Sequence, residues 1–294
     1  MQVVANGIRI EAEEHGSPSG EPLLLIMGLG MQLVAWHEDF VASLVARGFR
    51  VIRFDNRDAG LSQGFDELGV PSLVLDALRF TFGLRVRSPY GLADMADDSV
   101  GVLDALGIAQ AHICGASMGG MIAQQIALRH SGRVKSLTLM MTSSGARKLP
   151  GPSMKVRGAL LARPDDPGSV DSVVAHYVRL YRLIGSPGFP ANDDYLNSQL
   201  QRAVRRAYRP RGVARQLVAI AADGDRSNLL DRIAAPTQIV HGNSAPLIPV
   251  AAAHDLVAKI RGAGLDLIDG MGHDLPEPLW PRFVANLAEV AARA

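Results

Sequence analysis

Short runs of almost continuous hydrophobic residues alternate along the chain with segments in which apolar side chains recur every three or four positions. Such runs are typical of strands covered on both faces, whereas the periodic segments are typical of amphipathic helices. The pattern predicts strands at residues 22–28, 49–55, 111–116, 135–142, 236–242 and 265–270, and helices near 38–47, 92–106, 118–131, 249–261 and 279–293. This alternation predicts an α/β fold with a doubly wound, mostly parallel sheet.

Three segments depart from this rhythm. The first residues alternate around Asn6-Gly7, which predicts a hairpin. Residues 63–90 are long for a connection and contain an apolar, helix-like piece at 73–84, which would either line a substrate entrance or pack a cap onto the core. Residues 144–229 contain helical patterns and no convincing strand. We expect an α/β core at 1–143 and 230–294, interrupted by an all-helical cap at 144–229.

Four arginines recur at helical spacing in this expected cap: Arg202, Arg205, Arg206 and Arg209. Such a stripe indicates a solvated helix face or, alternatively, a rim that attracts anionic substrates.

Composition narrows the function classes. The chain has 294 residues, of which 48% are hydrophobic and 20% charged, and its net charge is +1, so no global field steers it toward nucleic acid. Its start resembles no secretory signal, and no uncharged apolar run is long enough for membrane insertion. A single cysteine, Cys114, rules out an intramolecular disulfide and fits a buried thiol. We therefore expect a cytoplasmic protein.

The main chemical signal is Ser117, in "HICGASMGGMIAQQIALRH" (112–130). A predicted strand ends at Ala116 and a predicted helix begins at Met118, so the serine occupies the corner of a Gly-x-Ser-x-Gly turn. A nucleophile elbow needs such a tight corner between small residues, because the hydroxyl must be exposed above the sheet. The alternative is a glycine-rich start of a helix without catalytic chemistry.

A serine nucleophile requires a histidine base, and His273 is the best placed of the eight histidines. It follows the last predicted strand in "LDLIDGMGHDLPEP", where the carboxyl ends of parallel strands meet. His37, His112, His130 and His241 fall in predicted strands or helices, where structural roles are expected.

Backbone donors for an oxyanion are expected in the glycine-rich loop of "LLLIMGLGMQLVAW" (23–36). We predict the N–H groups of Leu29 and Met118 as the donors, with Gly28 beside the substrate. The competing interpretation is a phosphate or dinucleotide loop, but no Gly-Lys-Ser/Thr follows, and Asp55 lies within "FDNRDAGLS". The spacing of histidines, cysteine and acidic residues predicts no metal site, and no cofactor is implied.

These motifs resemble those of the α/β-hydrolase superfamily with a helical cap, over essentially the whole chain. "GASMGG" is similar to the family's elbow, "MGLGMQLVAW" to its oxyanion loop, "DNRDAGLS" to the turn after the next strand and "MGHDLP" to its histidine loop. Within the superfamily the chain is most similar to carboxylesterases of the aclacinomycin methylesterase type.

The resemblance also exposes a missing residue. Where relatives carry His-Gly-x-x-Asp-Pro, with the aspartate orienting the histidine, residues 241–246 read "HGNSAP", so Ala245 occupies the acid position. The acid could come from elsewhere, although "TSSGARKLPG" (142–151) after the preceding strand contains none, and Asp269 and Asp274 are poorly placed by sequence. Alternatively, the chain has lost turnover and binds ligands, or Ala245 is a substitution in an otherwise active enzyme. The intact serine, histidine and oxyanion loop favour the substitution.

The resemblance and the motifs together imply a cofactor-independent serine hydrolase acting on a small-molecule carboxylic ester. A C–C bond hydrolase or a perhydrolase remains open, because fold and motif do not determine the substrate. A ligand-binding protein without turnover is the non-enzymatic alternative.

Overall fold

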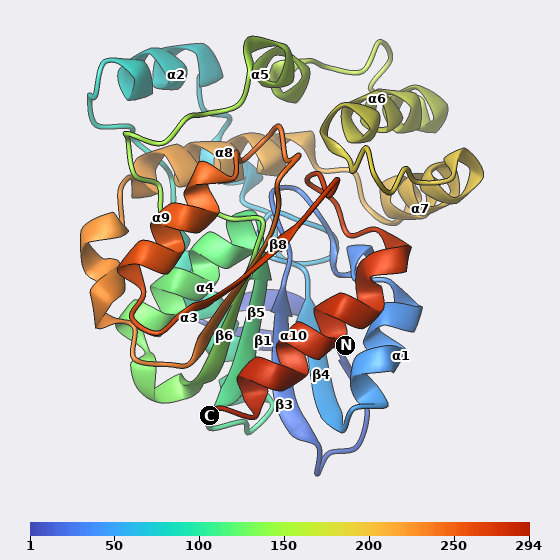
Figure 1. Ribbon diagram of the computed structural model, residues 1–294. Coiled ribbons are helices and arrows are strands. Elements are labelled where there is room, and N and C mark those ends of the chain that lie inside the picture. The colour runs from blue at the N-terminus through green and yellow to red at the C-terminus, as the bar shows by residue number, and fades with distance from the viewer.

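One sheet of eight strands organises the molecule (Figure 1). The computed structural model describes residues 1–294 and orders the strands β1-β2-β4-β3-β5-β6-β7-β8. Their bounds are β1 (Gln2–Ala5), β2 (Ile8–His15), β3 (Glu21–Ile26), β4 (Phe49–Phe54), β5 (Ala111–Ala116), β6 (Val134–Met140), β7 (Thr237–Gly242) and β8 (Gly264–Ile268). Strands β1, β2 and β4 pair antiparallel, and every other neighbouring pair is parallel. The predicted α/β fold class with a mostly parallel sheet is confirmed.

Helices cover both faces of this sheet. On one face lie α3 (Leu92–Ala105), α4 (Met118–Arg129) and α9 (Ala251–Lys259), and on the other α1 (Glu38–Val45) and α10 (Trp280–Ala291). The predicted helices therefore exist, with ends shifted by at most two residues. Two hydrophobic clusters, one on each face, hold the layers together.

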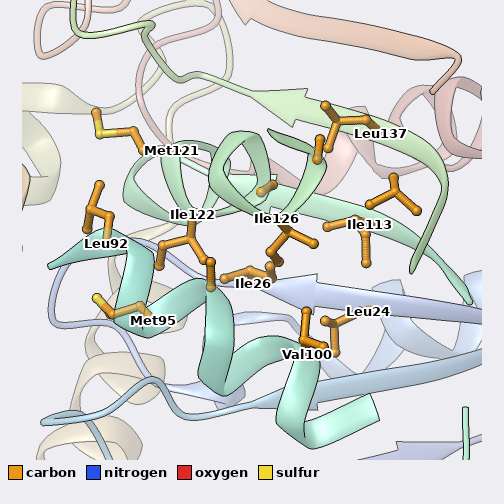
Figure 2. Packing of buried hydrophobic residues seen from close by; sticks show 14 of the residues in the cluster. Leu24, Ile26, Leu92, Met95, Val100, Ile113, Met121, Ile122, Ile126 and Leu137 are labelled. Atoms are coloured by element: carbon orange, nitrogen blue, oxygen red, sulfur yellow. The ribbon is translucent and has the colours of Figure 1, made fainter. Parts of the chain in front are cut away.

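The larger cluster shows why the strands are apolar throughout. Leu24, Ile26, Ile113 and Leu137 project from β3, β5 and β6 toward α3 and α4, as Figure 2 shows. Their neighbours along each strand, such as Leu25 and Cys114, belong to the cluster on the opposite face. A strand that supplies both cores has no solvent-facing side, which explains its continuous hydrophobic sequence.

The N-terminal hairpin forms as predicted. Asn6 and Gly7 both have positive φ angles, 49° and 76°, which a two-residue turn between β1 and β2 requires.

Between β6 and β7 the chain forms no strand but four α-helices, α5 (Met154–Leu161), α6 (Val170–Ile184), α7 (Asp193–Arg206) and α8 (Pro210–Asp223), followed by a short 3-10 helix (Ser227–Arg232). Ser153, Ser169 and Asn192 cap the first three through side chains that accept backbone N–H bonds. Figure 1 shows these helices gathered over one end of the sheet. No helix combines the length and apolar character that a membrane-spanning segment needs.

The helix α2 (Leu73–Thr81) differs from expectation. The hypothesis that residues 73–84 pack a cap onto the core is wrong, because Phe80 is 52% exposed and Phe82 is 74% exposed. The only buried residue of the helix is Asp76, which pairs with Arg79 at 3.2 Å. The helix thus turns a polar side toward the protein and its apolar side outward.

Candidate active site

Ser117 occupies a strained corner between β5 and α4. Its φ and ψ angles are 55° and −119°, a conformation that side-chain-bearing residues rarely adopt. Two bonds hold the corner: the Ser117 N–H donates to the Met140 carbonyl at 2.9 Å, and the Thr142 hydroxyl donates to the Ser117 carbonyl at 2.6 Å. The neighbouring strand β6 therefore maintains the geometry that leaves the serine side chain at the surface of the turn.

The glycines around the serine are required by close packing. A Cβ atom on Gly119 would lie 2.0 Å from the Ile26 carbonyl oxygen, and one on Gly115 would lie 2.2 Å from the Gly119 carbonyl oxygen. No larger residue fits either position without movement of the backbone. The start of α4 consequently lies directly against β3, and the Gly-x-Ser-x-Gly pattern has a steric cause.

His273 comes from the loop after β8 and contacts this serine. Its Nε2 atom lies 3.0 Å from the Ser117 Oγ atom, although the two residues are 156 positions apart. The backbone N–H of His273 donates to the Ile184 carbonyl at the end of α6, at 2.7 Å. The helical segment between β6 and β7 therefore helps to hold the histidine loop in place.

The other nitrogen of this imidazole has no partner. If Nε2 accepts the Ser117 hydroxyl proton, Nδ1 must carry hydrogen, yet Nδ1 is buried without a hydrogen bond. Burial first, and repulsion from His241 second, lower the pKa of His273 to about 3. The ring is therefore neutral at ordinary pH, and its protonated form is unstable here.

Ala245 lies beside the histidine loop. The adjacent Ser244 N–H donates to the Met271 carbonyl at 3.1 Å, and the Ala245 side chain is buried. A methyl group at this position accepts no hydrogen bond and carries no charge, so it cannot stabilise a protonated His273.

No other carboxylate replaces the missing one. Asp274 accepts bonds from the hydroxyl and the N–H of Ser186, and Asp269 accepts a bond of 2.6 Å from the Asn243 amide. Since His273 Nδ1 has no partner at all, the hypothesis that an acid from elsewhere in the chain orients this ring is wrong for the structure described.

His241 is a neighbour whose influence the sequence did not reveal. It is fully buried, as the expected structural role requires, and its Nε2 atom must donate to the Ile248 carbonyl at 2.9 Å, because a carbonyl only accepts. The Nδ1 atom of His241 is also buried without a partner, and burial lowers the pKa of His241. Two neutral imidazoles thus lie near each other.

The predicted oxyanion loop approaches the serine closely. A Cβ atom on Gly28 would lie 3.1 Å from Ser117 Cβ, which indicates how little space separates them. The Leu29 and Met118 N–H groups have no hydrogen-bond partner within the protein. The loop is tied by the Gly30 N–H to Gln216 of α8 at 2.8 Å, and by Asn56 to the Met27 carbonyl at 2.9 Å.

A buried carboxylate, that of Asp55, binds the segment that follows this loop. Asp55 accepts bonds from the N–H groups of Leu33 and Leu61, at 2.7 and 2.8 Å, and pairs with Arg206 of α7 at 2.7 Å. Burial is the main influence on Asp55 and raises its pKa. The core and the helices between β6 and β7 are joined by this ion pair.

The arginine stripe is therefore not simply a solvated face. Arg206 pairs with Asp55, Arg209 donates to the Gly60 carbonyl at 2.7 Å, and Arg202 forms a more exposed pair with Glu38 at 2.8 Å. The solvated-face interpretation is wrong for Arg206 and Arg209, because both bind groups of the core.

Two further predictions concern metal binding and the cysteine. No group of three or more histidine, cysteine or acidic side chains is placed to hold a metal ion. Cys114 is fully buried in β5, and burial raises the pKa of its thiol, which confirms the predicted buried, structural thiol.

Comparison with known proteins places this geometry in context. A rhodomycin D methylesterase from Streptomyces sp. (strain C5) is 27% identical over 306 residues, which cover 97% of this chain and 96% of the relative. A 2-hydroxymuconate semialdehyde hydrolase from Pseudomonas sp. (strain CF600) is 26% identical, with 100% of this chain and 94% of the relative covered.

Solved structures share the fold at lower identity. A meta-cleavage product hydrolase from Pseudomonas fluorescens IP01 superimposes with a TM-score of 0.76 at 20% identity, over 100% of this chain and 97% of that one. A thermophilic esterase from Thermogutta terrifontis gives a TM-score of 0.70 at 21% identity, over 99% and 98%. The pattern of the alpha/beta hydrolase fold family matches residues 21–277. The chain therefore belongs to the alpha/beta hydrolase fold family.

Proposed function

We propose that this protein is a serine hydrolase of carboxylic esters that forms an acyl-enzyme on Ser117. The observation that carries the proposal is the 3.0 Å contact between Ser117 Oγ and His273 Nε2 at the strained corner. The rhodomycin D methylesterases among its relatives, 27% identical over nearly the full chain, support an ester as the substrate. The proposed setting is the cytoplasm, and residues 144–229 are proposed as the cap that selects the substrate.

The proposed reaction has two steps. Ser117 Oγ attacks the ester carbonyl while His273 Nε2 takes its proton, and the Leu29 and Met118 N–H groups bind the developing oxyanion. The tetrahedral intermediate collapses, the C–O bond to the alcohol breaks, and His273 returns the proton to the leaving alkoxide. Water, deprotonated by the same histidine, then attacks the acyl-enzyme; the C–O bond to Ser117 breaks, His273 returns the proton to Ser117 Oγ, and the acid leaves.

Ala245 limits the rate of both steps. Each passes through protonated His273, and this cation lacks a counter-charge, in agreement with the low pKa of the ring. In a serine protease triad, loss of the carboxylate costs about 10⁴ in kcat, or roughly 5.5 kcal/mol. We therefore propose weak turnover with an otherwise complete site.

Other substrates and a non-catalytic role are the alternatives. The 26% identity to 2-hydroxymuconate semialdehyde hydrolase keeps substrates other than esters open, including C–C bond hydrolysis and, on the same fold, perhydrolysis. The unpartnered Nδ1 of His273 fits a homologue that binds ligands without turnover.

Labelling and hydrolysis of the full chain separate these functions. An ester hydrolase reacts with a fluorophosphonate at Ser117, identified by mass spectrometry, and cleaves p-nitrophenyl acetate or butyrate faster than Ser117→Ala. Resistance to labelling in both the native chain and Ala245→Asp, with both folded, would support ligand binding instead. Labelling without ester cleavage would direct the search to other substrates, beginning with 2-hydroxymuconate semialdehyde.

A further inference from the structure

The helix α2 presents its hydrophobic side to solvent. Val74 is 76% exposed, and the exposed Leu75, Leu78 and Phe80 follow on the same short helix, whereas Asp76 is buried. An amphipathic helix normally buries its apolar stripe. Here the stripe faces outward, which leaves hydrophobic area available for a contact outside the protein.

The helix α5 and the loop before it extend this surface. Met154 is 79% exposed and Leu161 is also exposed. A Cβ atom on Gly83, just after α2, would lie 2.7 Å from the Arg147 guanidinium, so the two segments adjoin. Outside residues 68–84 and α5, the only exposed large hydrophobic side chains are Met1, Val4, Leu61 and Leu229. Exposed apolar side chains are thus concentrated in one region.

This region is also strongly basic. Every lysine and arginine between residues 146 and 163 is exposed, as are Arg85 and Arg87, and Asp76 is the only acidic residue in 68–87 or 146–163. The only ion pair within these segments joins Asp76 to Arg79. The whole chain carries 30 basic and 29 acidic residues, so this positive excess is local and does not reflect the charge of the chain as a whole.

We propose that residues 68–87 and 146–163 form a docking surface for an anionic lipid bilayer. Exposed leucine, valine and phenylalanine side chains would enter the boundary between headgroups and acyl chains, and the surrounding cations would bind anionic headgroups. Each contribution alone gives weak binding, but the two together give stable, reversible attachment without a spanning helix.

Charge favours a bilayer over a second copy of the chain. A symmetric dimer through this surface would place its own unpaired cations opposite the same cations of the partner. An anionic bilayer satisfies both the apolar and the basic side chains. Figure 1 shows α2 and α5 on the same side of the molecule as α6 and α7. Since α6 also bonds to the His273 loop, docking would place the lipid on the side of the molecule where the helix that holds this loop lies.

Vesicle co-sedimentation of the full chain tests the proposal without depending on ester turnover. Vesicles in which about a third of the lipid is phosphatidylglycerol should bind the protein at least about tenfold more tightly than vesicles of phosphatidylcholine alone. Raising the salt concentration should release it, because counter-ions screen the cations. Binding that is equal for both vesicle types, or absent from both, would overturn the proposal.

Variants locate the contact. Phe80→Ser/Phe82→Ser removes apolar side chains and Lys148→Glu/Lys155→Glu reverses two charges; each should weaken binding to the anionic vesicles at least about tenfold. Val4→Ser and Arg47→Glu change an exposed valine and an exposed arginine outside the surface, and should leave binding unchanged. Equal losses in all four variants would contradict the proposed surface. A concentration-dependent dimer in lipid-free sedimentation, abolished by Phe80→Ser/Phe82→Ser, would identify a second copy as the occupant and overturn the proposal.

Discussion

His273 bonds Ser117 through one ring nitrogen and nothing through the other. The 3.0 Å contact at Nε2 is the arrangement that proton transfer from the serine requires, whereas Nδ1 is buried without a partner. Because Ala245 lies at the expected acid position, the chain offers a direct test of what the carboxylate contributes.

Ala245→Asp should raise kcat for p-nitrophenyl butyrate by a factor between about 10² and 10⁴, because the new carboxylate accepts the Nδ1–H bond and stabilises the imidazolium. Ala245→Asn, of similar size but uncharged, serves as the matched control and should recover only a small part of this gain. If neither variant increases turnover, position 245 is not the acid position.

The pH dependence should differ between the two forms. His273 acts as a base when neutral, and with a pKa of about 3 it is neutral from pH 8 down to about 5, so kcat/KM of the native chain should not decrease across this range. In Ala245→Asp the carboxylate raises the histidine pKa toward or above its usual value near 6.5, so activity should fall on acidification below about pH 6.5. Matching acid limbs in the two pH–rate profiles would contradict this assignment.

Asp274→Asn should change activity less than about threefold despite the position next to His273. Its two carboxylate oxygens accept bonds from the N–H and the hydroxyl of Ser186; in asparagine the oxygen can accept the N–H bond and the amide NH2 can donate to the hydroxyl oxygen. The rate of fluorophosphonate labelling gives the measurement even if ester turnover is slow. A loss approaching 10⁴ would instead identify Asp274 as the acid.

Gly28→Ala should decrease kcat at least about tenfold, because the new methyl group would lie 3.1 Å from Ser117 Cβ and would displace the proposed oxyanion donors. The measurement is made in the Ala245→Asp background, where turnover is high enough to follow. Gly132→Ala provides the control, since its Cβ would meet no atom within 4 Å. Equal activity of the two variants would show that the loop is not part of the site.

Arg206→Met should lower the free energy of unfolding by about 3 kcal/mol, because it leaves the fully buried Asp55 without its counter-charge. Arg202→Met, on the same helix, removes the exposed pair with Glu38 and should cost less than about 1 kcal/mol. Urea denaturation compares the two. Similar decreases in the free energy of unfolding would mean that the buried Asp55–Arg206 pair stabilises the protein no more than the exposed Glu38–Arg202 pair.

Local patterns predicted the sheet and the candidate site well. The strand and glycine signals around Ser117 identified a tight corner, and the loop after the last strand placed His273 at the same edge of the sheet. Both inferences depend on short segments and on the rule that parallel strands end together. The sequence thus contained what was needed to bring two residues 156 positions apart into one hypothesis.

Long-range pairing and helix orientation could not be predicted in the same way. The partner of Arg206 is Asp55, 151 positions away, and no local pattern links the two. For α2, periodicity indicates an amphipathic helix but not which side faces the protein. The proximity of His241 to His273 likewise depends on how two loops fold together, so its effect on the histidine pKa was not foreseen.

The Asp55–Arg206 pair also restricts which of the helices between β6 and β7 can move. If α7 swung away from the core, it would expose a carboxylate that is otherwise completely enclosed and would break the bond from Arg206 to Gln32. The bond from Gly30 to Gln216 restrains α8 in the same manner. Movement within this segment is therefore expected to involve α5 and its flanking loops, while α7 and α8 remain attached to the core.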